Sequence, residues 1–230
     1  MALVVWLPTG SASAQTVPVA SYRVNWWDAA SISAAVALHL TPSALGLQEG
    51  PPSCVPCDPA TLSGIDRWAV HPVSKSADVG SDVALLAVLG GTALAGLGSQ
   101  PAEQWRGNLV VFANTAAWTQ AISEWLKVGV RRERPVMYTD EAAAAASVRS
   151  SQMSMPSGHA ALAFAAATSY FVISGRQHLP HRTRNAILFY AGAVSVASLR
   201  VFAGKHFPTD VLAGAVLGSG IGWLVPTIHP

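Results

Sequence analysis

The sequence predicts an all-α protein, a membrane-embedded bundle of five or six core helices. Hydrophobic residues make up 51% of the 230 residues and charged residues 11%, against roughly 25% charged residues in soluble domains. Long apolar segments recur along the chain, separated by polar or proline-containing stretches. No segment alternates polar and apolar residues over a useful length, so strands are not predicted.

The charge balance limits the class of partner. A net charge of +2 is small, and no cluster of Lys and Arg is interleaved with aromatic residues as a nucleic-acid surface requires. Nucleic acid is therefore not expected as a partner, whereas a membrane is. The sequence does not indicate an oligomeric state.

The N-terminal residues 1–21 are interpreted as a tail or a signal remnant. Ala2–Leu7 is apolar, and Ala12-Ser13-Ala14 resembles a small-residue cleavage site. The apolar run is shorter than a normal signal core and has no basic residue before it. A signal-peptide remnant and a disordered tail both remain open.

Residues 22–81 are expected to form an N-terminal helix and a Cys-containing extramembrane loop. Trp26 and Trp27 suit a membrane interface. The apolar run Ala29–Leu40 is too short to span cleanly, so it is either a poor first span or a helix on the surface. Gln48–Asp82 is polar and rich in proline, which is typical of a loop.

Cys54 and Cys57 are the two cysteines of the chain. Zinc needs about four ligands, and no second Cys/His pair has a suitable spacing. A redox Cys-x-x-Cys is expected in a βαβ setting, which this chain lacks. A small structural disulfide in an oxidising compartment is the better interpretation.

Residues 82–230 are expected to form the helical core. Helices are predicted over Asp82–Gly98, Asn108–Leu126, His159–Ile173, Ala186–Leu199 and Asp210–Ile228. Turns are predicted at Pro101–Gly107 and Gly175–Asn185, a long loop at Val128–Met155 with a short helix in its alanine run Ala142–Ala146, and a connection at Arg200–Thr209. Small residues in Ala160–Ala167 and Ala213–Gly222 favour close helix packing. Several segments are shorter than the ~20 residues of an upright span, so a soluble bundle is the alternative.

The turn Pro156-Ser157-Gly158-His159 opens onto an apolar helix. A helix start presents free backbone N–H groups and the positive end of the helix dipole, which together bind anions. The serine hydroxyl and the imidazole stand at the same place. A plain turn with a helix-capping serine is the alternative interpretation.

Two further segments carry cations or imidazole. Lys127 and Arg134 are seven residues apart, so a continuing helix would aim both at one point; basic residues complementing a helix end are the alternative. His206 and Asp210 are four apart across Pro208. The carboxylate can accept a hydrogen bond from one imidazole nitrogen and leave the other free as a nucleophile. A carboxylate at a helix N-terminus beside an incidental histidine is the alternative.

These three segments fall on one side of an alternating helical bundle. Three cations, a hydroxyl and helix N–H groups then form a site for a multiply charged oxyanion, of which phosphate fits best. The cations are Lys127, Arg134 and Arg200.

The chain resembles the type 2 phosphatidic acid phosphatase superfamily, which includes bacterial acid phosphatases and vanadium haloperoxidases. Its three motifs are Lys127 with six residues before Arg134-Pro135, then Pro156-Ser157-Gly158-His159, then Arg200 followed by His206 and Asp210. One departure is Leu199, which stands where the family usually has serine.

The resemblance implies a role for each residue. His206 would attack phosphorus, Asp210 would orient it, and His159 would protonate the leaving alkoxide and later activate water. The phosphoryl oxygens would be held by Lys127, Arg134, Ser157, Gly158 and Arg200. Since side chains supply the positive charge, no metal or other cofactor is expected.

The sequence therefore predicts a metal-independent phosphatase acting on a phosphate or diphosphate monoester of a membrane lipid, or on a small phosphomonoester. A vanadate-dependent haloperoxidase and a non-catalytic protein that binds phosphorylated lipid are the alternatives. The expected location is the bacterial inner membrane with the site facing the periplasm, a soluble periplasmic protein being the alternative. The distribution of Lys and Arg does not follow the positive-inside rule clearly.

Overall fold

The computed structural model describes residues 21–97 and 102–230; the predicted tail lies almost entirely outside these ranges. The described residues form helices and contain no strand. The long helices are α1 (Trp26–Ala44), α3 (Lys75–Leu97), α4 (Ala102–Val130), α6 (Gly158–Arg176), α7 (Arg182–Phe202) and α8 (Pro208–Ile228). The short helices are α2 (Gly64–Arg67) and α5 (Ala142–Ala145), and three 3₁₀ turns cover Pro59–Thr61, Pro135–Tyr138 and Arg149–Gln152.

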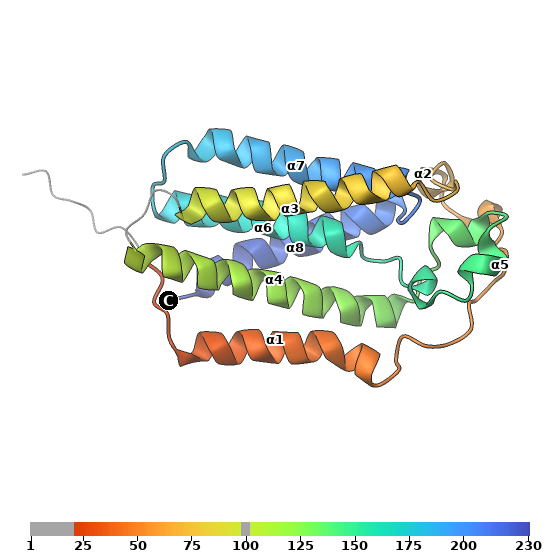
Figure 1. The fold of residues 1–230 in the computed structure, drawn as a ribbon, viewed down its shortest axis with the longest axis horizontal. Helices are drawn as coiled ribbons and strands as arrows, with labels where there is room; N and C mark the ends of the chain where they lie inside the picture. The colour runs from red at the N-terminus through yellow and green to blue at the C-terminus, as the bar shows by residue number, and fades with distance from the viewer. Residues whose placement is uncertain (1–20, 98–101) are drawn as a thin grey trace, which may run out of the picture.

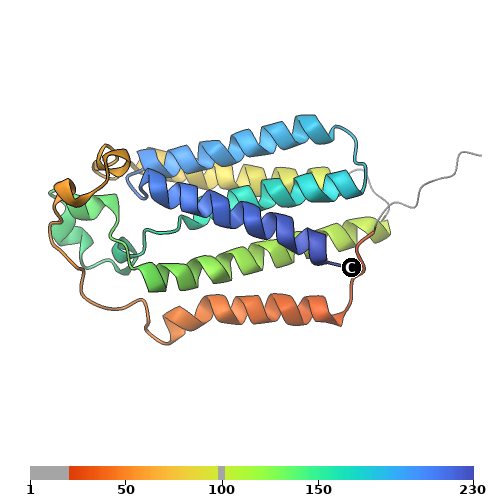
Figure 2. The same ribbon diagram turned by 180° about the vertical axis from the view of Figure 1, so that it is seen from behind.

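The six long helices lie side by side along the length of the molecule (Figures 1 and 2). Helix α6 occupies the centre and contacts α3, α4, α7 and α8. Helix α1 packs along α4 at the edge, where the indole N–H of Trp118 donates to Ser31 Oγ at 3.0 Å and that of Trp125 donates to the Leu38 carbonyl at 2.9 Å. The predicted all-α bundle of five or six core helices is confirmed, with six long helices.

Small residues bring α6 and α8 into backbone contact, as predicted. A Cβ atom at Gly218 would lie 2.0 Å from the Ala161 carbonyl oxygen, and one at Gly222 would lie 2.4 Å from the Ala165 carbonyl oxygen. Only glycine fits at such a distance. This packing fixes the register of α8 on α6.

Several predicted helix boundaries are wrong. Helix α3 begins at Lys75 instead of Asp82, because the charged residues of its first turns face other side chains instead of forming a loop. Helix α4 already includes Ala102–Gly107, where a turn was predicted, and continues to Val130. Helix α1 runs through Pro42 and begins at a capping box of Asn25 and Asp28.

Three of these helices, α3, α7 and α8, are long and apolar enough to cross a membrane. The short elements α2 and α5 lie at one end of the bundle, where α4 ends and α6 and α8 begin (Figure 1). Cys54 and Cys57 form a disulfide at this end, as predicted. The backbone N–H of Cys57 donates to the Met137 carbonyl at 2.8 Å, which ties the Cys-containing loop to the residues after α4.

Candidate active site

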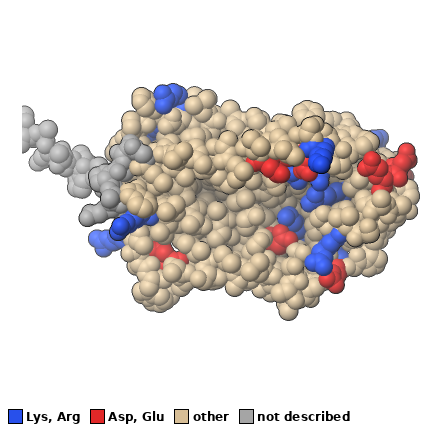
Figure 3. Space-filling model, viewed as in Figure 1, with Lys and Arg blue, Asp and Glu red and all other residues tan. Residues whose placement is uncertain are grey.

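The structure brings the three predicted segments together at the end of the bundle that carries α2 and α5. The end of α4, the start of α6 and the link between α7 and α8 meet there (Figure 1). In the space-filling view, Lys, Arg, Asp and Glu side chains gather over this end (Figure 3). The expectation that these segments share one side of the bundle is confirmed.

The start of α6 has the features of an anion site. Ser157 is the N-cap residue, but its side chain makes no capping hydrogen bond, and its buried Oγ has no partner among the described residues. The helix-capping interpretation of this serine is therefore wrong. A Cβ atom at Gly158 would lie 3.6 Å from Lys127 Nζ, so the ammonium group lies against the first turn of α6.

Lys127 and Arg134 reach the site by a different route from the predicted one. The helix ends at Val130, and Arg131 has a left-handed backbone with φ of 48°. Arg134 follows in extended conformation, with its N–H donating to the Ser151 carbonyl at 2.8 Å. The prediction that one continuing helix aims both side chains is wrong.

Two of the arginines offer unused donors. Nε of Arg134 and Nε of Arg200 are both buried without a hydrogen-bond partner among the described residues. One terminal nitrogen of Arg200 donates to Asp78 and, at 3.1 Å, to Ser81 Oγ. Burial, followed by the charge of Arg200, lowers the pKa of Arg134 to about 10, so its guanidinium remains charged at neutral pH. With Ser157 Oγ, these atoms are three free donors on three predicted phosphate ligands.

His206 is buried, and its tautomer follows from its partner. Nδ1 lies 2.7 Å from the Ser154 carbonyl oxygen. A carbonyl can only accept, so Nδ1 carries the proton, and Nε2 of the neutral ring holds a free lone pair. The carboxylate of Asp210 is 3.8 Å from Nδ1, so the expected hydrogen bond to the carboxylate is replaced by one to the backbone.

The surroundings keep this imidazole neutral. Burial, together with the positive charges of Arg134 and Arg200, lowers the pKa of His206 to about 3, although Asp210 opposes the shift. A neutral imidazole with a free lone pair is the form that acts as a nucleophile.

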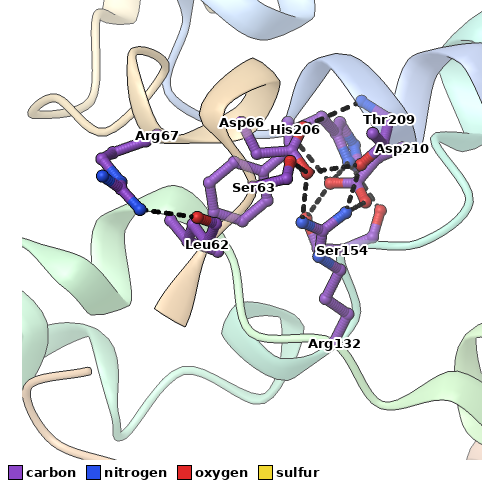
Figure 4. A network of polar contacts seen from close by, with 10 residues as sticks. Leu62, Ser63, Asp66, Arg67, Arg132, Ser154, His206, Thr209 and Asp210 are labelled. Atoms are coloured by element: carbon purple, nitrogen blue, oxygen red, sulfur yellow. Dashed lines mark hydrogen bonds and ion pairs between the residues drawn. The ribbon is translucent and has the colours of Figure 1, made fainter. Parts of the chain in front are cut away.

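Asp210 is fully buried at the centre of the polar network in Figure 4. Its oxygens accept from Ser154 Oγ at 2.6 Å, the Phe207 N–H at 2.8 Å and Arg132 at 2.7 Å. Arg132 also donates to Asp66 of α2 at 2.8 Å. The sequence interpretation missed both Arg132 and Asp66.

Asp66 connects α2 to the start of α8. It accepts from the Thr209 N–H at 3.1 Å and from Thr209 Oγ1 at 2.8 Å. Burial acts to raise the pKa of Asp66, but hydrogen bonds from Arg132 and Thr209 outweigh it and hold the pKa below its usual value. Arg132 could have been found from the sequence, because it lies between Lys127 and Arg134 of the first motif.

His159, the predicted proton donor, faces helix α3. Its Nε2 lies 2.8 Å from Asp82 Oδ1. Asp82 was also missed, because it was placed at the boundary between the predicted loop and the predicted helix. Among the described residues, no group of three or more His, Cys, Asp or Glu side chains is arranged to hold a metal ion.

Comparison with known proteins identifies the family. Residues 108–230 match the PAP2 superfamily. The chain is 34% identical to phosphatidylglycerophosphatase B of Bacillus subtilis over 123 residues, which are 51% of this chain and 54% of that protein. It is 32% identical to decaprenylphosphoryl-5-phosphoribose phosphatase of Mycobacterium tuberculosis over 170 residues, 74% of this chain and 79% of that protein.

The chain is also similar in structure to a transmembrane PAP2 type phosphatidylglycerolphosphate phosphatase from Bacillus subtilis. The TM-score is 0.48 at 22% identity, covering 87% of this chain and 94% of that one. The sequence match covers more than half of the chain and all three motif segments. The chain therefore belongs to the PAP2 superfamily.

Proposed function

We propose that this protein is a metal-independent phosphatase that hydrolyses a phosphate monoester of a membrane lipid through a phosphohistidine intermediate. The observation that carries the proposal is the set of free donors around His206. Arg134 Nε, Ser157 Oγ and Arg200 Nε are buried and have no hydrogen-bond partner within residues 21–97 and 102–230, and all three belong to the segments that meet there. Buried polar atoms without partners are rare in proteins, and here they suit a phosphoryl group.

The first step forms the phosphoenzyme. Nε2 of His206 attacks phosphorus while the bond from phosphorus to the ester oxygen breaks, and His159 protonates that oxygen as it leaves. The arginines, Lys127 and the N–H groups at the start of α6 stabilise the charge on the phosphoryl oxygens. Because these groups are held in place before the substrate arrives, they favour the transition state.

The second step releases phosphate. His159 is now neutral and accepts a proton from water, and the water oxygen attacks phosphorus. The bond from phosphorus to Nε2 breaks, and His206 returns to its neutral form. The Ser154 carbonyl holds Nδ1–H throughout, so the same nitrogen acts as nucleophile and leaving group.

An apolar groove beside the site supports a lipid substrate. It has a volume of about 290 Å³ and is lined by α1, α3, α4 and α6, including Leu89, Ala117 and Leu162. Gln120 also lines it, and Gln120 Oε1 would lie 3.6 Å from a Cβ atom at Gly158. The groove therefore extends from the anion site toward the middle of the bundle. The two curated relatives are both named as phosphatases of lipid-linked phosphates.

We place the site on the periplasmic side of the bacterial inner membrane. The disulfide lies at the same end as the site, and disulfides persist in oxidising compartments. Five cations at this end pair with carboxylates: Lys127, Arg132, Arg149, Arg200 and Lys205. The positive-inside rule counts Lys and Arg whether or not they are paired, so these residues do not support the placement, which rests on the disulfide.

Phosphate release by detergent-purified protein tests the proposal. Phosphatidylglycerophosphate and a polyprenyl phosphate sugar phosphate are offered beside the variants His206→Ala and His159→Ala. We expect release by the wild type and no phosphoenzyme in His206→Ala after a base quench with ³²P-labelled substrate. Undiminished turnover in His206→Ala would contradict the phosphohistidine. Turnover seen only with vanadate, halide and peroxide would indicate a haloperoxidase, and binding without release a non-catalytic protein.

A further inference from the structure

Helix α3 presents three polar side chains to the site from one face. Ser81 and Asp82 follow Asp78 by three and four residues, which places all three together on one helix surface. Asp78 pairs with Arg200 and, at 3.1 Å, with Lys205. Ser81 accepts from Arg200 at 3.1 Å. The match to the PAP2 superfamily begins at residue 108, so it does not include this helix.

The third residue of this face contacts the second catalytic histidine. Asp82 Oδ1 lies 2.8 Å from His159 Nε2. The imidazole is 32% exposed and the carboxylate 56% exposed, so both groups lie at the open edge of the site. The pairs of Asp78 with Arg200 of α7 and Lys205 of the α7–α8 link hold α3 in place. Ser74 N–H donates to the Ala203 carbonyl at 3.2 Å just before the helix. Asp82 is therefore held at a fixed point relative to the site.

We propose that Asp82 is the positioning residue of the proton donor. It accepts from Nε2–H of His159, which fixes the ring plane and leaves Nδ1–H of the imidazolium as the proton given to the leaving oxygen. The other charged groups near this ring are Arg200 and Asp78, and both are already paired with each other. Asp82 is thus the carboxylate that orients the ring.

This role predicts a dependence on the leaving group. An alkoxide needs a proton to depart, whereas p-nitrophenolate departs without one. The inference rests on the proposed function, since it concerns the step that protonates the leaving oxygen. kcat/KM is the quantity to measure, because it includes the steps up to departure and excludes the later hydrolysis of the phosphoenzyme.

The experiment compares Asp82→Asn with the wild type on a short-chain alkyl phosphate and on p-nitrophenyl phosphate. We expect kcat/KM to fall about tenfold or more for the alkyl ester and less than about twofold for the aryl ester. Asp82→Glu, which keeps the carboxylate, should recover part of the loss. Glu141→Gln removes an exposed carboxylate at the same end of the bundle that contacts neither histidine, and it should leave both values unchanged.

Two results for Asp82→Asn would overturn the inference. Equal losses on both esters in Asp82→Asn would show a structural role, and no loss would show that the contact is incidental. His159→Ala should show the same preference for the aryl ester in stronger form. If the wild type hydrolyses neither the two esters nor the lipid phosphates, the proposed function fails. If the wild type is active and Asp82→Asn is equally active, only the role of Asp82 is rejected.

Discussion

Arg132 donates a hydrogen bond of 2.7 Å to Oδ1 of Asp210, so the carboxylate beside His206, the proposed nucleophile, is held from outside its own helix. The guanidinium carbon also lies 4.4 Å from the centre of the Phe207 ring. Because Asp210 is fully buried, this arginine is the cation that compensates its charge. The candidate site therefore depends on a residue outside the set of predicted phosphate ligands.

Replacing Arg132 should damage both stability and activity. Arg132→Met leaves Asp210 buried without its cation, and breaking one partner of a buried pair costs about 3–5 kcal/mol. We expect a large fall in the thermal unfolding midpoint in detergent and a fall in kcat. Arg131→Met is the matched control, since the Arg131 side chain donates to the Glu49 backbone carbonyl at the surface. Equal effects of the two variants would contradict this role.

Stability should fall as the pH is lowered from 6.5 toward 3. Burial and the nearby arginines lower the pKa of His206 from 6.5 to about 3. In this range the unfolded chain binds a proton that the native protein does not, so stability is lost on acidification. Relative to pH 7.5, we expect the wild type to lose about 2 kcal/mol more than His206→Gln at pH 5.

Denaturant unfolding of the two proteins across this pH range measures the difference. The glutamine side chain does not titrate, so the comparison removes the contributions of the other acidic groups. Parallel pH curves for the wild type and His206→Gln would show that the buried imidazole is not kept neutral.

The packing of α6 against α8 should tolerate no added carbon at its closest point. Gly218→Ala places a Cβ atom 2.0 Å from the Ala161 carbonyl oxygen, and we expect a loss of about 1–3 kcal/mol or more. Gly220→Ala is the matched control on the same helix, because no atom lies within 4 Å of its added Cβ. It should be neutral or slightly stabilising. Thermal unfolding of both variants separates crowding from helix propensity.

Filling the apolar groove should lower kcat/KM for long-chain substrates and not for short-chain ones. Ala117→Trp places a large side chain in the groove, so we expect kcat/KM to fall about tenfold or more for a long-chain lipid phosphate. Activity on a short-chain phosphate should be retained. Ala191→Trp alters an exposed position on α7 and serves as the control. A similar loss on both substrates in Ala117→Trp would place the lipid chain elsewhere.

The motif residues were predictable because their types and spacing are encoded locally. Their meeting at one end followed from the alternation of helices. The runs of small residues predicted close packing of α6 and α8, although not that these two helices pack against each other. The start of α3 could not be predicted in the same way. Asp78 and Asp82 made this segment resemble a loop, and only their partners in distant segments explain why they lie on a helix.

The hydrogen-bond partner of His206 could not be predicted from the sequence for a different reason. Its Nδ1 bonds a backbone carbonyl, that of Ser154, and every residue has such a group, so no pattern indicates it. Arg132 was missed although it lies between Lys127 and Arg134 of the first motif. The left-handed turn at Arg131 changes the direction of the chain there, and this turn decides that Arg132 faces Asp210.

The glycine contacts between α6 and α8 have a mechanical consequence. Each of these helices carries one motif at its start, and their separation is set by backbone atoms, with the Ser157 N–H donating to the Asp210 carbonyl at 3.0 Å. Backbone contacts of this kind leave little room for sliding. We therefore expect changes in bilayer thickness to tilt the outer helix α1 while the distance between the two catalytic segments stays constant.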